Sequence, residues 1–158
     1  VVSTANLIED FKANGVPEVR MATLDGKEFS LRDFEKQNPR VVIIVNFWAS
    51  WCAPCVSEFP AMLKLLDLFH GQVKLIAISA DDRKDDVEHF LKAFEGSSNP
   101  NLIVLWDKDS AQLRQSYGTN KLPESFIVSH GKLNMKVTGG IDWAGSDIIS
   151  RIKGFIGE

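Results

Sequence analysis

One uninterrupted run of branched aliphatic residues, Val41-Val42-Ile43-Ile44-Val45, constrains the fold more than any other segment. Successive residues of a strand point to opposite faces of its sheet, so a strand without polar positions must be covered on both faces. Such coverage is typical of a central strand in a parallel sheet that has helices packed on either side. The run therefore predicts an α/β protein built around this strand.

Strand and helix patterns alternate along the rest of the chain. Further strands are predicted at Val73–Ile78, Leu102–Trp106, Ser125–Ser129 and Leu133–Thr138, with a hairpin around Asp25-Gly26 in the segment Val16–Phe34. Apolar spacing predicts helices over residues 59–69, 87–94 and 148–156, a short helix at Asp109–Tyr117 and a helical lead-in over Val1–Asn14. The acidic run Asp81–Asp86 predicts the charged start of a helix. Together these patterns indicate an α/β sandwich with a mixed central sheet.

The composition fits one globular domain, and no repeat or long linker divides the chain. The 158 residues are 44% hydrophobic and 25% charged, with a formal net charge of −3, which excludes intrinsic disorder. Lys and Arg are outnumbered, so we expect no nucleic-acid partner. No apolar run reaches the roughly 20 residues that span a bilayer. Because Val1-Val2-Ser3 shows neither an initiator Met nor a signal-peptide pattern, we expect an N-terminal targeting segment or anchor to be missing.

The two cysteines, Cys52 and Cys55, stand three positions apart, just after the predicted central strand. A helix that begins here offers unpaired N–H groups and the positive end of its dipole, and both stabilise a thiolate. Since the thiolate is the reactive form, Cys52, at the exposed end, is the expected nucleophile. Cys55 lies one turn later, close enough to attack a mixed disulfide on Cys52. The pair thus predicts thiol redox chemistry.

A structural disulfide and half of a zinc site are the alternatives for this pair. A four-ligand zinc site would need two further Cys or His residues at suitable spacing, and the three histidines are scattered. We therefore expect no metal site.

Glu58 follows Cys55 by three positions, which places the two residues on the same side of a helix. An acidic group beneath a dithiol can accept the proton of Cys55, or raise the thiol pKa by like-charge repulsion. The alternative is an ordinary glutamate on the helix surface. Position alone favours that alternative.

The segment Trp51-Cys52-Ala53-Pro54-Cys55 after a strand resembles the thioredoxin superfamily. Asn46 at the strand end, Glu58 and Phe59-Pro60 are similar to the TlpA/ResA/DsbE group of extracytoplasmic thiol–disulfide oxidoreductases. The similarity extends over nearly the whole chain. It includes the N-terminal hairpin, the strand and helix inserted at residues 76–94, and the segment Leu122–Val128.

The resemblance implies a single thioredoxin-like domain over residues 1–158. Its N-terminal extension with the hairpin would cover residues 1–34, and its core would cover residues 41–158, with an inserted strand–helix element near residues 79–101. The resemblance also implies that Pro123 is cis and faces the cysteine pair, where the Leu122 backbone pairs with an incoming peptide as an added strand. Trp51 is a candidate contact for the same partner, since aromatic anchors recur at interfaces.

On this resemblance we expect a protein-disulfide reductase without metal, nucleotide or flavin, because the dithiol of Cys52 and Cys55 is the redox centre and Glu58 assists it. The expected partners are a disulfide-containing target protein, of the cytochrome c maturation or copper-site assembly type, and an upstream membrane thiol reductase. The protein is expected to be a monomer in the bacterial periplasm, tethered to the membrane through its missing N-terminal segment.

Two other functions stay open at this point. A thiol peroxidase shares the inserted strand–helix layout, but its reactive Cys normally needs a nearby Thr and Arg, and Ser50 and Val56 flank this pair instead. A non-catalytic module that presents a peptide groove near Pro123 is the other alternative.

Overall fold

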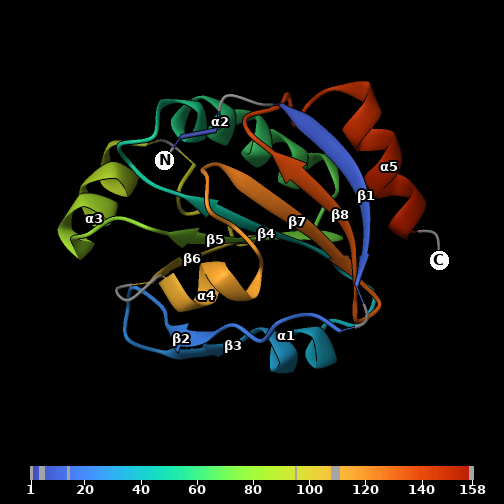
Figure 1. Ribbon diagram of the computed structural model, residues 1–158, viewed down its shortest axis with the longest axis horizontal. Coiled ribbons are helices and arrows are strands. Elements are labelled where there is room, and N and C mark those ends of the chain that lie inside the picture. The colour runs from blue at the N-terminus through green and yellow to red at the C-terminus, as the bar shows by residue number, and fades with distance from the viewer. Residues whose placement is uncertain (1, 4–5, 14, 95, 108–110, 157–158) are drawn as a thin grey trace.

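Strand β4 (Val42–Trp48) runs through the middle of a six-stranded mixed sheet in the computed structural model (Figure 1). The structure describes all residues except 1, 4–5, 14, 95, 108–110 and 157–158. All of β4 is buried. It pairs in parallel with β5 (Val73–Ser79) and antiparallel with β7 (Glu124–Ser129). The predicted strand is therefore central, although its pairing is parallel on one side only.

The sheet carries helices on both faces, as predicted. Its strand order is β1-β8-β7-β4-β5-β6, where β1, β6 and β8 are Leu7–Ala13, Leu102–Trp106 and Lys132–Thr138. The helices that follow β4 along the chain are α2 (Ala53–Leu68), α3 (Lys84–Ala93), α4 (Ala111–Ser116) and α5 (Ser146–Ile156). Figure 1 shows α2 and α5 on one side of the sheet and α4 on the other. The α/β prediction with a mixed sheet is thus confirmed, and residues 109–110 of the short predicted helix lie outside the described residues.

The N-terminal segment corrects one prediction. The helical lead-in over Val1–Asn14 is wrong, because β1 is an edge strand that pairs antiparallel with β8, with Leu7 opposite Thr138. Residues 1, 4–5 and 14 of that segment lie outside the described residues. The spacing of Leu7, Ile8 and Phe11 fits a helix, yet the segment is short, and the open edge of β8 offers backbone hydrogen bonds to a strand. Tertiary pairing therefore outweighs local periodicity here.

The predicted hairpin is present and is shorter than expected. Strands β2 (Arg20–Ala22) and β3 (Glu28–Ser30) pair antiparallel, and the chain then enters α1 (Leu31–Gln37). The Ser30 hydroxyl caps this helix by accepting a hydrogen bond from the Asp33 N–H at 3.2 Å. The cap turns residues 31–34, which the sequence assigned to the hairpin, into the first turn of a helix. Figure 1 shows this unit on the same side of the sheet as α4.

The inserted helix α3 packs on the helix that carries the cysteines. Phe90 of α3 and Phe94, the C-cap residue of that helix, contact Phe59 of α2, with ring centroids 5.8 and 5.0 Å away. Trp48 stacks on Phe59 at 6.1 Å. Aromatic pairs at these separations contribute about 0.5–1.5 kcal/mol each beyond their burial. The cluster braces α2 against the end of β4.

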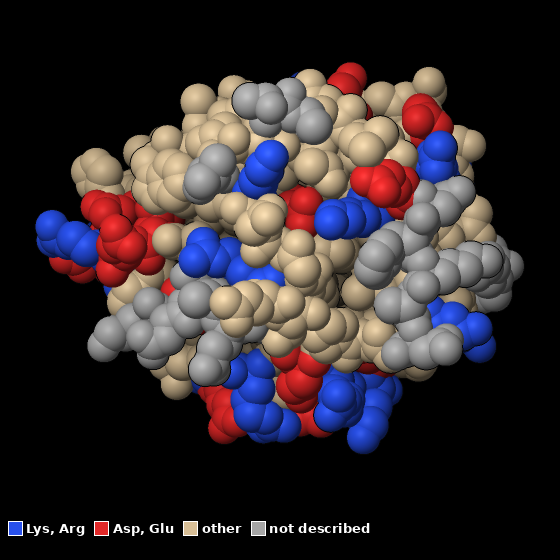
Figure 2. Space-filling view, in the orientation of Figure 1, with Lys and Arg blue, Asp and Glu red and all other residues tan. Residues whose placement is uncertain are grey.

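On the face shown in Figure 2, acidic and basic side chains are interspersed over most of the surface. An acidic group stands out at the end occupied by α3, whose first turn contains Asp85 and Asp86. Among the described residues, no helix has the length and apolar character needed to cross a membrane.

Phe126 tests the packing beneath β4. Its ring is fully buried in β7 and lies 6.3 Å from that of Phe47 and 5.2 Å from that of Tyr117. We expect Phe126→Ala to lower the free energy of unfolding by about 3–5 kcal/mol, because it removes buried area and leaves a cavity. Urea denaturation measures this change. Leu68→Ala, at a side chain that is 50% exposed, is the control and should change stability by less than about 0.5 kcal/mol. A Phe126 effect as small as the control's would contradict this account of the core.

Candidate active site

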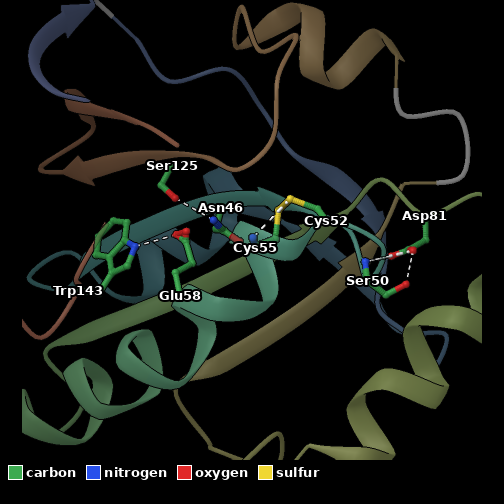
Figure 3. The surroundings of a disulfide bond; sticks show 8 residues. All are labelled: Asn46, Ser50, Cys52, Cys55, Glu58, Asp81, Ser125 and Trp143. Carbon is green, nitrogen blue, oxygen red and sulfur yellow. Dashed lines mark hydrogen bonds between the residues drawn. A yellow bond between two sulfur atoms is a disulfide. The ribbon is translucent and has the colours of Figure 1, made fainter. Parts of the chain in front are cut away.

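The two cysteines lie at the start of α2, just after the loop that follows β4. Cys52 is the N-cap residue of α2, and its Sγ accepts a hydrogen bond from the Cys55 N–H at 3.4 Å. The two side chains form a disulfide, with the Cα atoms 5.3 Å apart (Figure 3). Pro54 in the first turn costs no hydrogen bond, since N–H groups there have no partner within the helix. The sequence prediction of a dithiol at a helix N-terminus thus matches the geometry.

The exposure of Cys52 differs from the prediction. We expected it at the exposed end of the helix, but in this disulfide form Cys52 is fully buried and Cys55 is 3% exposed. As the N-cap residue, Cys52 turns its sulfur back toward the N–H groups of the first turn rather than toward solvent. Its neighbour Trp51 is instead 55% exposed, the most exposed large apolar side chain among those that the structure describes. A partner would therefore meet Trp51 before it meets the sulfur atoms.

Glu58 is buried, which rules out the surface-glutamate alternative. Its side chain lies one turn after Cys55 in α2 and is only 5% exposed. Oε1 accepts a hydrogen bond from the indole Nε1 of Trp143 at 2.8 Å (Figure 3). Within the described part of the chain, Oε2 is buried and has no hydrogen-bond partner. Burial raises the pKa of Glu58 to about 8, although the hydrogen bond from Trp143 opposes this shift.

Sequence reasoning missed Trp143. It stands 85 residues after Glu58, in the segment between β8 and α5, and its side chain is fully buried. Nothing in the local pattern around it signals a partner on α2. Only the packing of the two segments brings the indole to the carboxyl group.

An open cavity of about 860 Å³ adjoins Glu58. Its walls come from the N-terminal segment, α2 and the segment before α5, through Ser3, Asn6, Pro54, Ser57, Glu58, Ala61, Gly140, Ile141 and Asp142. The cavity connects the surroundings of the carboxyl group with solvent.

Asp81 ties a second segment to the cysteine loop. Its carboxylate is 2% exposed and accepts hydrogen bonds from the Ser50 N–H at 3.1 Å and the Ser50 hydroxyl at 2.6 Å (Figure 3). It also accepts one from the Ser79 hydroxyl at 2.5 Å. The sequence interpretation placed Asp81 in the charged start of a helix, but α3 begins at Lys84. Asp81 instead links the end of β5 to the loop that precedes Cys52.

Leu122 and Pro123 immediately precede β7. The Leu122–Pro123 peptide bond is cis, which confirms that part of the prediction. Ser125 follows Pro123 by two residues, and its hydroxyl accepts a hydrogen bond from Asn46 in β4 at 2.8 Å. The Leu122 carbonyl accepts a hydrogen bond from the Ser3 N–H at 2.6 Å, and Val2 forms a parallel bridge with Leu122. The backbone predicted to receive a peptide is thus paired with the chain's own N-terminal segment in this structure.

No group of three or more His, Cys, Asp or Glu residues suited to holding a metal ion occurs within the residues that the structure describes.

Comparisons with known proteins agree on the kind of protein. The chain matches the AhpC/TSA family over residues 8–136. Thiol-disulfide oxidoreductase ResA of Geobacillus thermodenitrificans (strain NG80-2) is 31% identical over 125 residues, which cover 78% of this chain and 67% of ResA. ResA of Bacillus subtilis (strain 168) is 29% identical over 130 residues, or 81% and 68% of the two chains. The crystal structure of a thiol:disulfide interchange protein, a thioredoxin family protein from Chlorobium tepidum TLS, is similar with a TM-score of 0.72 at 23% identity, over 94% of this chain and 99% of that one. The last likeness confirms the predicted thioredoxin fold.

The buried Glu58 makes stability depend on pH. Between its ordinary pKa of 4.5 and its folded pKa of about 8, the folded chain holds a proton that the unfolded chain releases. Stability is therefore greatest below pH 4.5, as far as this group is concerned, and is lost as pH rises toward 8. We expect the free energy of unfolding of the oxidised protein to fall by up to about 1.4 kcal/mol per pH unit between pH 5 and 8, relative to Glu58→Gln.

Urea denaturation of both proteins at pH 5, 6.5 and 8 measures the difference. Glu88→Gln, which changes a glutamate on α3 whose side chain is 43% exposed, is the matched control. It should leave the wild-type dependence of the free energy of unfolding on pH unchanged. Parallel stability curves for wild type and Glu58→Gln would show that the carboxyl group is not held neutral in the fold.

Proposed function

The chain belongs to the AhpC/TSA family and is a thiol–disulfide oxidoreductase, and from this premise we propose that it reduces disulfides in target proteins through Cys52 and Cys55. One observation carries the proposal: a Cys52–Cys55 disulfide at the N-terminus of α2, with the buried carboxyl group of Glu58 one turn later. A structural disulfide would need no such carboxyl group beside it. A redox-active pair gains a proton acceptor from it.

The proposed reaction has two exchange steps. In the first, the Cys52 thiolate attacks one sulfur atom of the target disulfide, so that a Cys52–target bond forms and the other target sulfur leaves as a thiolate. In the second, the Cys55 thiolate attacks Cys52 Sγ, the mixed disulfide breaks, and the second target sulfur leaves. The target gains two electrons and, with two protons, becomes a dithiol. The protein ends as the Cys52–Cys55 disulfide seen in the structure.

Glu58 is proposed to take the proton of Cys55 in the second step. Burial raises the pKa of Glu58 to about 8, close to the value of about 8.5 for an ordinary thiol. Proton transfer between groups of similar pKa is nearly balanced and can run in either direction. Glu58 can therefore return the proton when the disulfide is reduced again.

The segments around the dithiol are proposed to receive the target. Trp51 is exposed beside Cys52 and would contact the partner, and the Leu122 backbone before Pro123 would pair with it as an added strand. In this structure Ser3 and Val2 hold that backbone, so the target would take their place.

The electron donor, the targets and the location are proposed from the resemblance to extracytoplasmic thiol–disulfide oxidoreductases. We propose an upstream membrane thiol reductase as electron donor, targets of the cytochrome c maturation or copper-site assembly type, and an extracytoplasmic location. An oxidising compartment suits a pair that cycles through a disulfide. Because the dithiol carries both electrons, the scheme needs no metal, nucleotide or flavin.

The AhpC/TSA match keeps the thiol peroxidase as a second candidate. A peroxidase would need a hydroxyl group free to bind peroxide near Cys52, but the Ser50 hydroxyl donates to the Asp81 carboxylate at 2.6 Å. A peroxide-consumption assay with the reduced protein separates the two functions. Turnover of peroxide faster than that of disulfides would favour the peroxidase.

Single cysteine variants test the order of the two steps. We expect Cys52→Ser to abolish reduction of a disulfide-containing peptide, because it removes the nucleophile. Cys55→Ser should instead accumulate a Cys52–peptide mixed disulfide, since the second step is blocked. Non-reducing electrophoresis and intact mass detect that species, and the double variant is the control that cannot form it. Normal turnover by Cys55→Ser would show that the two-cysteine mechanism is wrong.

The reduction potential of the pair tests the direction of electron flow. We expect a value near −250 mV or lower, roughly the thioredoxin range, from titration against dithiothreitol and glutathione buffers with thiol alkylation and mass detection. A value near about −120 mV, as for a strong oxidant, would make the protein a disulfide donor instead.

A further inference from the structure

Hydrogen bonds of the surrounding turn place Trp143 where it meets Glu58. It lies in a tight turn before α5, in which the Asp142 carbonyl accepts a hydrogen bond from Gly145 N–H and the Asp142 carboxylate accepts one from Ala144 N–H, both at 3.0 Å. The indole ring is fully buried. Its only polar atom, Nε1, donates to Glu58 Oε1 at 2.8 Å. A residue needed only to fill space would not require an N–H group that points at the Glu58 carboxyl group.

The chemistry of the indole decides how Glu58 holds its proton. An indole N–H is a donor and never an acceptor. Oε1 must therefore accept a hydrogen bond whether the carboxyl group is charged or neutral, and in the neutral form this contact favours Oε1 as the carbonyl oxygen, because a carbonyl oxygen accepts more strongly than a hydroxyl oxygen. The proton of the neutral form is left to Oε2, which is buried and has no hydrogen-bond partner in the described part of the chain.

We propose that Trp143 is a positioning residue of the thiol–disulfide reaction: its N–H occupies Oε1 and so confines the exchangeable proton of Glu58 to Oε2. The inference rests on the proposed function, in which Glu58 exchanges a proton with Cys55. A carboxyl group that rotated freely would present its proton on either oxygen, in orientations that do not serve the exchange. The contact with Trp143 keeps one oxygen out of the reaction and the other available to it.

The other groups around Glu58 leave this task to Trp143. Cys55 lies on its helix and Cys52 caps that helix, and Asp142 is the other acidic residue that lines the adjoining cavity. Ser3 and Asn6 line the cavity from the N-terminal segment and do not titrate. Each hydrogen bond to a carboxylate favours its charged form, so the Trp143 N–H also moderates the effect of burial on the pKa of Glu58.

Trp143→Phe tests the proposal, because it keeps an aromatic ring and removes the donor. The measurement is the rate at which the reduced protein reduces a disulfide-containing peptide, as a function of pH. The wild-type profile should show an inflection that Glu58→Gln abolishes. In Trp143→Phe we expect this inflection to move upward by about one pH unit, since the carboxylate loses a hydrogen bond. In the double variant with Glu58→Gln, loss of the indole should have no further effect on the profile.

Trp106→Phe is the matched control. It also removes an indole N–H that donates a hydrogen bond, here to the Asp81 carbonyl at 2.7 Å, but it does not touch Glu58. Its inflection should stay at the wild-type pH. An unchanged inflection in Trp143→Phe, with only a lower rate or lower stability, would overturn the proposal and leave Trp143 a packing residue.

A measurement on unsubstituted protein guards against a variant that fails to fold. The assigned ¹⁵N–¹H resonance of the Trp143 indole in the oxidised protein should titrate with the same midpoint as the Glu58 carboxyl carbon, and this titration should vanish in Glu58→Gln. An indole resonance that does not respond to pH would overturn the proposal.

The two failures are distinguishable. A wild-type chain that shows the coupled titration but reduces no peptide at any pH would contradict the proposed function and retain the Trp143–Glu58 coupling. A chain that reduces peptides with no effect of Trp143→Phe on the inflection would contradict the positioning role alone.

Discussion

The junction between β4 and α2 is the constraint on which the rest of the structure depends. β4 is buried on both faces and paired on both edges, so its end has little freedom to move. That end delivers Cys52 to the N-cap of α2, where first-turn N–H groups and the helix dipole favour a thiolate. The aromatic contacts of α3 and the hydrogen bonds of Asp81 hold the same junction from the side. The inserted strand–helix element thus supports the reactive pair rather than standing apart from it.

The burial of Glu58 lowers the stability of the fold. A carboxyl group that is 95% buried is expensive to ionise, and one hydrogen bond from Trp143 offsets only part of that penalty. An apolar residue at this position would pack without the penalty. A glutamate at this position is explained by its chemistry: burial gives it a pKa of about 8 next to the Cys52–Cys55 pair. Chemistry and stability are therefore in direct competition at this residue.

Sequence reasoning was most successful where a pattern is local. The apolar run at residues 41–45 identified the central strand, and the spacing of Cys52 and Cys55 placed the pair at the start of a helix. It failed over residues 7–13, because helical spacing and strand pairing compete there and only the open edge of β8 decides between them. It also placed Cys52 at an exposed end, since periodicity does not reveal which way an N-cap side chain turns.

The sequence alone determined the α/β class, the redox pair and the position of Glu58 relative to it, because each depends on residues that are close along the chain. Only the tertiary structure decided that Glu58 is buried, that Trp143 donates to it from 85 residues away, and that Ser3 pairs with the Leu122 carbonyl. Those contacts join segments with no shared local pattern. They form because the sheet and its covering helices bring the segments together, and burial then sets the chemistry of the groups that meet.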